Sequence, residues 1–110
     1  MKIFDRKPDF GTLGFILVEN AFDKGAIAEL RRATDNLVEC SRTVAANDDI
    51  FDLDPSHTPH CPRVRRIKNP TQHHDAYDDA MRTPALLDIV AVLLGAELRF
   101  DHSKLNFKPP

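Results

Sequence analysis

The pattern of apolar and polar positions in the first half of the chain predicts a short strand followed by a long helix. Residues 15–18 form a compact apolar run between a glycine and polar residues, which is typical of a short buried strand. Asp23 provides a helix N-cap, and apolar positions recur at spacings of three and four from there to about Ala45. Charged residues fill the opposite side, so we expect this helix to cover a core.

The next stretch, residues 47–62, has no helical period and contains four aspartates and three prolines. A loop of this length is uncommon in a compact domain, and it is either a lid that contacts substrate or a plain surface excursion. If this loop meets the substrate, its acidity favours a cationic or neutral molecule over a polyanion.

The second half of the sequence predicts short elements with clear stop signals. Residues 64–67 favour a short strand that Pro70 ends, and a helix follows from residue 71 or 72 to about Met81. A helix over residues 84–94 then has Thr83 as its N-cap.

That last helix is apolar nearly all round, so we expect it to be sandwiched between two layers of the fold. Gly95 closes it as a left-handed cap residue, and a closing strand is expected from Glu97.

The final stretch, residues 100–110, alternates in polarity like a β-strand. One face carries Phe100, His102, Lys104 and Asn106, and the other carries Asp101, Ser103, Leu105 and Phe107. An unpaired strand edge tends to pair with another chain, and almost no strand material precedes this one. We therefore expect the front end of a longer domain, or a terminal strand that pairs with a partner.

Composition limits the partners and the location. The 110 residues carry a formal net charge of −2 and are 42% hydrophobic, which suits one small globular domain and excludes binding to nucleic acid or membranes through bulk charge. The basic stretch 63–68 is typical of a solvated face rather than a phosphate-binding patch. Cys40 and Cys61 make no disulfide framework, and no apolar run forms a signal core or a membrane span, so we expect a cytoplasmic protein.

Two histidine clusters have ligand types but poor spacing for a metal site. His73 and Asp75 show the His-x-Asp spacing of iron enzymes, but residues two apart diverge at a helix start, so surface or capping roles are favoured. His57, His60 and Cys61 lack a second cluster to complete a zinc site, so a loop with incidental histidines is favoured.

Lys104 and Lys108 lie on one face of the final strand. A lysine that faces the interior of a sheet is costly unless an anion meets it. Spacing alone therefore favours an outward, solvated face for the lysines, with Leu105 and Phe107 on the buried face.

Four segments in order resemble the phytanoyl-CoA dioxygenase family of iron(II)- and 2-oxoglutarate-dependent oxygenases. Residues 14–22 are similar to the Gly-Phe strand that leads into the family's first long helix, and residues 65–70 are similar to its middle segment. Residues 86–95 resemble its aliphatic helix that ends in Leu-Leu-Gly. Residues 102–110 resemble the strand that leads to the iron-binding His-x-Asp in bacterial members.

The resemblance implies an α+β fold, in which a helical cover accompanies the first strands of a double-stranded β-helix (jelly-roll) oxygenase, truncated before the iron-binding motif. The complete domain would use Fe(II) and 2-oxoglutarate, release succinate and hydroxylate a small organic substrate. The iron ligands would all follow Pro110, so this chain supplies no catalytic or metal-binding residue. Lys104 and Lys68 match positions near the co-substrate, where cations suit a dicarboxylate, and this match favours Lys104 facing inward.

Two hypotheses from different classes follow. In the first, residues 1–110 are the N-terminal part of a single oxygenase domain, inactive alone and unable to bind either cofactor tightly without the missing C-terminal half. In the alternative, the chain is a short non-catalytic protein or interaction module that pairs through its C-terminal strand. A zinc module around His57, His60 and Cys61 is a third interpretation.

Overall fold

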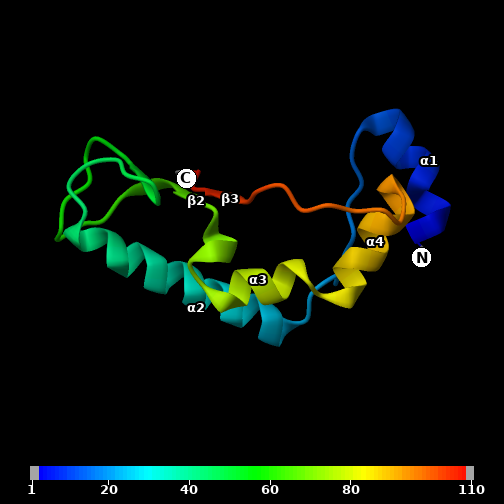
Figure 1. Cartoon of the computed structure of the whole chain (residues 1–110), viewed down its shortest axis with the longest axis horizontal. Helices are drawn as coiled ribbons and strands as arrows, with labels where there is room; N and C mark the ends of the chain where they lie inside the picture. The colour runs from blue at the N-terminus through cyan, green and yellow to red at the C-terminus, as the bar shows by residue number, and fades with distance from the viewer. Residues whose placement is uncertain (1–2, 109–110) are drawn as a thin grey trace.

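The computed structural model describes residues 3–108, and within that range the chain is a mixed α+β structure, as predicted (Figure 1). Its four α-helices are α1 (Ile3–Leu13), α2 (Lys24–Cys40), α3 (Asp75–Met81) and α4 (Pro84–Leu94). Its three strands are β1 (Phe51–Leu53), β2 (Val64–Lys68) and β3 (Lys104–Asn106). Short 3₁₀ helices span Ser41–Thr43 and Pro70–Gln72. The last two positions of the predicted terminal strand, Pro109 and Pro110, lie outside the described residues.

The long helix predicted after Asp23 is confirmed as α2. The Asp23 carboxylate accepts a hydrogen bond of 2.7 Å from the backbone N–H of Ala26, as an N-cap residue does. The helix ends at Cys40, before the expected end near Ala45, because its last turn tightens into a 3₁₀ helix.

The sheet has the order β1-β2-β3, and both strand pairs are antiparallel. The strand predicted over residues 64–67 is confirmed as β2. The prediction of a loop over residues 47–62 is wrong at β1. This segment is only three residues long but pairs with β2 as a strand. Side chains of Asn47 and Asp48 accept hydrogen bonds from backbone N–H groups at the two ends of β1, so this strand is set by local turn contacts and by pairing.

The C-terminal part of α2 packs against one face of the sheet through Leu37 and Val38, and the core lies between them. The buried apolar residues of this core are Leu37, Phe51, Val64 and Ile67. Leu105 and Phe107 of the last described segment are partly buried and pack against it. The prediction that these two residues form the buried face of the final strand is therefore confirmed.

The molecule is elongated, with extents of 48 × 28 × 27 Å, and carries the sheet at one end and α1 with α4 at the other (Figure 1). α4 packs against α1 and α3, but none of its residues is buried, and Leu94 is 67% exposed. The prediction that this helix is sandwiched between layers is wrong within residues 3–108, because no second layer covers its outer side there.

Two further strand predictions are wrong. Residues 15–18 form no strand, and Leu17 is 67% exposed because no strand lies beside this segment within residues 3–108. The closing strand begins at Lys104 rather than at Glu97, since only β3 reaches β2 and pairs with it.

Gly95 has a positive φ of 103°, as predicted, but its ψ of 164° places it outside the left-handed helical region.

The helices of the second half form with small changes in their starts. The predicted helix after Pro70 splits into a 3₁₀ turn and α3, which begins at Asp75. α4 starts where predicted, with Thr83 at the N-cap position, although the Thr83 hydroxyl donates to the carbonyl of Asp79 instead of capping. In the part of the chain that is described, no helix is long and apolar enough to cross a membrane.

Candidate functional site

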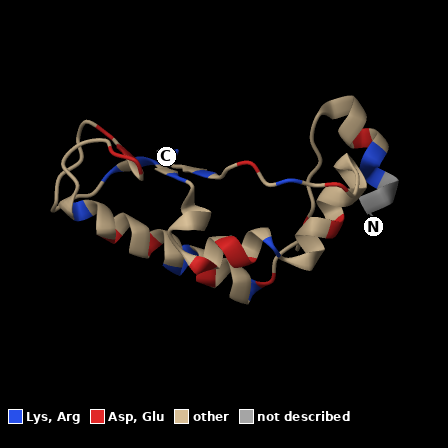
Figure 2. Ribbon diagram, viewed as in Figure 1, with Lys and Arg blue, Asp and Glu red and all other residues tan. Residues whose placement is uncertain are grey.

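Five polar side chains share the sheet face that points away from α2, and we call this group the polar sheet face: Asp52, Arg66, Lys68, Lys104 and Asn106. Their placement follows from the register, in which Asp52 pairs with Arg66, Arg66 with Asn106, and Lys68 with Lys104. Directly paired residues lie on the same side of a sheet, and the core residues of these strands lie on the other side. Figure 2 shows the Lys and Arg residues along β2 and β3.

Asp52 links the two cations of β2. Its Oδ1 lies 3.0 Å from Nζ of Lys68, and its Oδ2 lies 3.7 Å from Nη1 of Arg66. Arg66 Nε also donates to Oδ1 of Asn106 at 3.0 Å, and Lys68 Nζ donates to the carbonyl of Asp48 at 2.9 Å. Such partly exposed ion pairs contribute only about 0–1 kcal/mol each, so their main effect is to fix the directions of the two cations.

Lys104 lies directly opposite Lys68 and is exposed. It forms no ion pair and no side-chain hydrogen bond with any residue in the range 3–108. The sheet register thus places the two lysines singled out by the resemblance side by side on neighbouring strands. Within the described residues Lys104 faces away from the core and no second layer encloses it, which agrees with the orientation that spacing alone favours. The inward orientation that the resemblance favours depends on a layer beyond these residues and stays a prediction.

A hollow of about 480 Å³ continues the polar sheet face toward the end of β3. A β-bulge in the β1–β2 pair adds Arg65 to β2, so that Arg65 and Arg66 follow each other on the exposed side. These two arginines and Lys108 line the hollow, together with Asn106 and Asp52. Its lining therefore has more positive than negative side chains.

The aspartates of the predicted acidic loop are mostly occupied by local contacts. Asp48 Oδ1 accepts hydrogen bonds from the backbone N–H groups of Phe51 and Ile50, which hold the pKa of Asp48 below its usual value. The hydroxyl and the backbone N–H of Ser56 bind Oδ1 of Asp54 and lower the pKa of that carboxyl likewise. Asp52 is paired to cations, whereas Asp49 forms no ion pair and no side-chain hydrogen bond within residues 3–108. These contacts do not test the preference for a cationic or neutral substrate, which stays a prediction for this loop.

We expect the stability of the loop around β1 to fall in acid because of Asp48. A carboxyl whose pKa is lowered by folding stabilises the native state above its unfolded pKa, and this stabilisation is lost as the pH falls through the lower, folded pKa. The thermal midpoint should therefore drop as the pH is lowered from about 5 toward about 2. In Asp48→Asn, whose amide oxygen still accepts both hydrogen bonds, the drop should be smaller. Identical pH profiles for the two proteins would refute this assignment.

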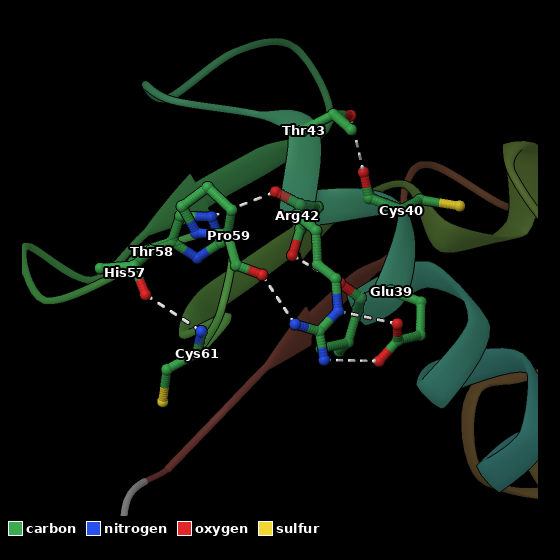
Figure 3. Close-up of polar contacts among 10 residues, drawn as sticks. Glu39, Cys40, Arg42, Thr43, His57, Thr58, Pro59 and Cys61 are labelled. Atoms are coloured by element: carbon green, nitrogen blue, oxygen red, sulfur yellow. Dashed lines mark hydrogen bonds and ion pairs between the residues drawn. The ribbon is translucent and has the colours of Figure 1, made fainter.

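His57 fastens the loop to the end of α2 (Figure 3). Its Nδ1 accepts from the backbone N–H of Arg63 at 2.9 Å, and its Nε2 lies 3.1 Å from the carbonyl of Ser41, to which it donates. Beside it, the Arg42 guanidinium binds the Glu39 carboxylate and donates to the carbonyl of Pro59 at 2.7 Å. Both ring nitrogens of His57 are thus engaged by backbone groups.

This geometry disfavours the zinc interpretation, because a histidine must free one ring nitrogen to bind a metal. Cys61 and Cys40 are exposed and free. Residues 3–108 contain no group of three or more His, Cys, Asp or Glu side chains arranged to hold a metal ion.

Replacing His57 should loosen this end of the sheet. His57→Ala leaves the Arg63 N–H without its partner and removes one of the two donors to the Ser41 carbonyl, which still accepts from the backbone N–H of Val44, so the free energy of unfolding in urea should fall by about 1–2 kcal/mol. His60→Ala is the matched control, because His60 is exposed and has no contact of this kind among the described residues, and it should change stability by less than about 0.5 kcal/mol. Equal losses in both variants would contradict the fastening role.

In the cluster at residues 73–75, His73 and Asp75 are exposed, which agrees with the predicted surface role, and the capping residue is His74 between them. His74 is the N-cap of α3, and its Nδ1 accepts a hydrogen bond of 3.1 Å from the backbone N–H of Ala76. His73 and Asp75 flank this cap at a helix start, where neither extends from a strand. They are not brought to the polar sheet face.

Sequence patterns did not single out Asp52, Asn106, Arg65 or Arg66 as site residues. The arginines belong to a basic stretch that is typical of a solvated surface, and Asp52 belongs to a predicted loop. The strand register brings these residues together on one face of the sheet. This register could have been inferred only if β1 had been recognised as a strand.

No protein-family model and no solved structure matches the chain. The chain is similar to a protein of Stutzerimonas stutzeri described as "Probable alpha-ketoglutarate-dependent hypophosphite dioxygenase", with 26% identity over 97 residues. The match covers 88% of this chain and 34% of the relative, so the chain spans about a third of the length of that curated relative. The chain thus has a distant and partial similarity to a 2-oxoglutarate-dependent dioxygenase.

Proposed function

We propose that residues 1–110 are the N-terminal part of an Fe(II)- and 2-oxoglutarate-dependent dioxygenase of the phytanoyl-CoA dioxygenase family. The observation that carries the proposal is the pairing of Lys68 with Lys104 on the exposed face of the sheet. It is supported by the partial similarity to a dioxygenase that uses the same co-substrate under its other name, alpha-ketoglutarate. The complete protein would oxidise a small molecule, and the relative's name gives a small anion, hypophosphite, for that protein.

The polar sheet face fits 2-oxoglutarate in charge. Arg66, Lys68 and Lys104 supply three positive charges and Asp52 one negative charge, so the face has a net charge of +2. 2-Oxoglutarate is a dianion, and charge-assisted hydrogen bonds to ammonium groups are among the stronger polar contacts. Lys104 has no side-chain partner within residues 3–108 and can bind a carboxylate, while Asp52 holds Lys68 in a fixed position beside it.

The described residues do not form an iron site, because no group of three or more His, Cys, Asp or Glu side chains among them could hold the metal. We therefore place the iron ligands in sequence that follows Pro110, and we assign no catalytic step to this chain. Its role would be to orient the co-substrate and to cover the outer face of the sheet with α2.

The layer arrangement supports this role. In two-layer β structures, the face of a sheet opposite its helical cover packs against the second sheet, mostly through apolar side chains. Here the side chains on that face are charged or carry an amide. In a jelly roll, such a face would line a polar ligand cavity rather than an apolar core, and Lys104 would then point inward.

The coding DNA past the codon for Pro110 tests this proposal. We expect the frame to continue into a His-x-Asp and a more distant histidine, and the complete protein to form succinate from 2-oxoglutarate with Fe(II) and oxygen. The 110-residue chain alone should form none. A stop codon directly after Pro110, or succinate formed by the isolated chain, would overturn the proposal.

A second candidate function rests on the edge position of β3. β3 pairs with β2 on one side, and within residues 3–108 its other edge has no strand partner. In a protein that ends near Pro110, this edge would add a strand from a partner, as interaction modules do. Size-exclusion chromatography separates the candidates, because an interaction module should form a defined complex that depends on β3.

A further inference from the structure

We infer that the hollow beside the polar sheet face is the binding site for the anionic group of the substrate, a small molecule that bears a carboxylate or a phosphorus oxyanion. This inference rests on the proposed function and deepens it. It assigns the two ends of the exposed sheet face to two anions: the Lys68–Lys104 end to 2-oxoglutarate and the Arg65–Lys108 end to the substrate, with Arg66 between the two.

The lining of the hollow supplies positive charge that is not committed to ion pairs. Within residues 3–108, Arg65 and Lys108 form no ion pair. Arg66 contacts Asp52 only at 3.7 Å, and no hydrogen bond in that range uses its Nη2. Asp52 lies closer to Lys68, at 3.0 Å, so its negative charge offsets the charge of Lys68 more than that of the arginines in the hollow.

The acidic groups near the hollow do not neutralise this positive charge. Asp54 is close enough to Arg65 for the arginine to help lower its pKa, but the two form no ion pair within 4.0 Å. The Asp54 carboxylate is instead bound by Ser56. Arginine is well suited to the task, because its planar fork binds carboxylate or phosphoryl oxygens through two donors at once.

The hollow has the size of a small-molecule site. A volume of about 480 Å³ lies within the range of about 300–1,000 Å³ that small-molecule sites occupy. Leu53 and Phe107 add apolar surface to a mostly polar lining, and Asn47 and Asn106 add amides. The hollow therefore offers cations for an anionic group and contacts for a short carbon skeleton.

The bulge explains how two adjacent arginines reach one hollow. In a regular strand, neighbouring side chains point to opposite faces, so one of them would enter the core. The extra residue in β2 lets both stay exposed, while Val64 and Ile67 on either side remain buried.

Calorimetric titration of the complete protein tests the inference, with acetate and inorganic phosphate as probes and 2-oxoglutarate at saturation. At least one probe should bind while 2-oxoglutarate is bound, and which of them binds identifies the oxyanion. The double variant Arg65→Gln/Lys108→Gln should weaken that binding about tenfold or more and change 2-oxoglutarate affinity less than about twofold. The matched control Arg31→Gln/Arg32→Gln removes the same charge from α2 and should change neither.

Three results would overturn the inference: no binding of either probe, displacement of the probe by 2-oxoglutarate, or equal weakening in the control double variant. A protein that binds 2-oxoglutarate but neither probe contradicts this inference alone. A protein that does not bind 2-oxoglutarate contradicts the proposed function itself. All four substituted side chains are exposed, and a thermal midpoint within about 2 °C of the unsubstituted protein verifies folding.

Discussion

Lys104→Gln in the complete protein should raise the KM for 2-oxoglutarate about 10- to 100-fold. Removing one charge-assisted contact with a carboxylate costs about 1.5–3 kcal/mol, and each 1.4 kcal/mol corresponds to about a tenfold change in affinity. The loss should be large because Lys104 has no partner of its own within residues 3–108, so its full charge is available to the ligand. Succinate formation measured against 2-oxoglutarate concentration gives the KM.

The control for this variant is Lys24→Gln at the start of α2, which removes the same charge far from the polar sheet face. It should leave the KM unchanged. Lys104→Arg should recover part of the affinity, because it keeps the charge while changing its geometry. If Lys104→Gln and Lys24→Gln behave alike, Lys104 does not bind the co-substrate.

Ile67→Ala should cause the largest loss of stability of any single substitution in this part of the chain. Ile67 is fully buried at the centre of the sheet, between Phe51 and Leu105 on the neighbouring strands. Truncating a buried isoleucine to alanine typically costs about 2–5 kcal/mol, from lost burial and the cavity that remains. Urea unfolding of the complete protein, followed by circular dichroism, measures this loss.

Leu17→Ala is the comparison for Ile67→Ala. Leu17 is 67% exposed within the described residues, so its truncation should cost less than about 1 kcal/mol if that surface stays open. A loss for Leu17→Ala as large as that for Ile67→Ala would show that other parts of the protein bury this segment. A small effect of Ile67→Ala would contradict the core described here.

The helices of this chain could be predicted from sequence because their signals are local. Asp23 before α2 and the Thr-Pro pair before α4 place the helix starts correctly. α1 could not be predicted in this way, because Pro8 and Gly11 lie within it and both are poor helix formers.

The strands were harder to predict because their stability comes from pairing. Residues 15–18 have the composition of a strand but no partner within residues 3–108, whereas β1 has a partner in spite of its aspartate. The same reasoning applies to the polar sheet face. Lys68 and Lys104 could be named from a resemblance, but Asp52, Asn106 and the bulged arginines join them only through the register of β2.

Lysine reactivity in the complete protein tests whether the polar sheet face holds 2-oxoglutarate. Acetylation rates of single lysines are measured by mass spectrometry with and without 2-oxoglutarate. Bound 2-oxoglutarate should protect Lys68 and Lys104 from acetylation and leave the acetylation rate of Lys24 unchanged. Equal acetylation of Lys68 and Lys104 in the presence and absence of saturating 2-oxoglutarate would contradict binding at this face.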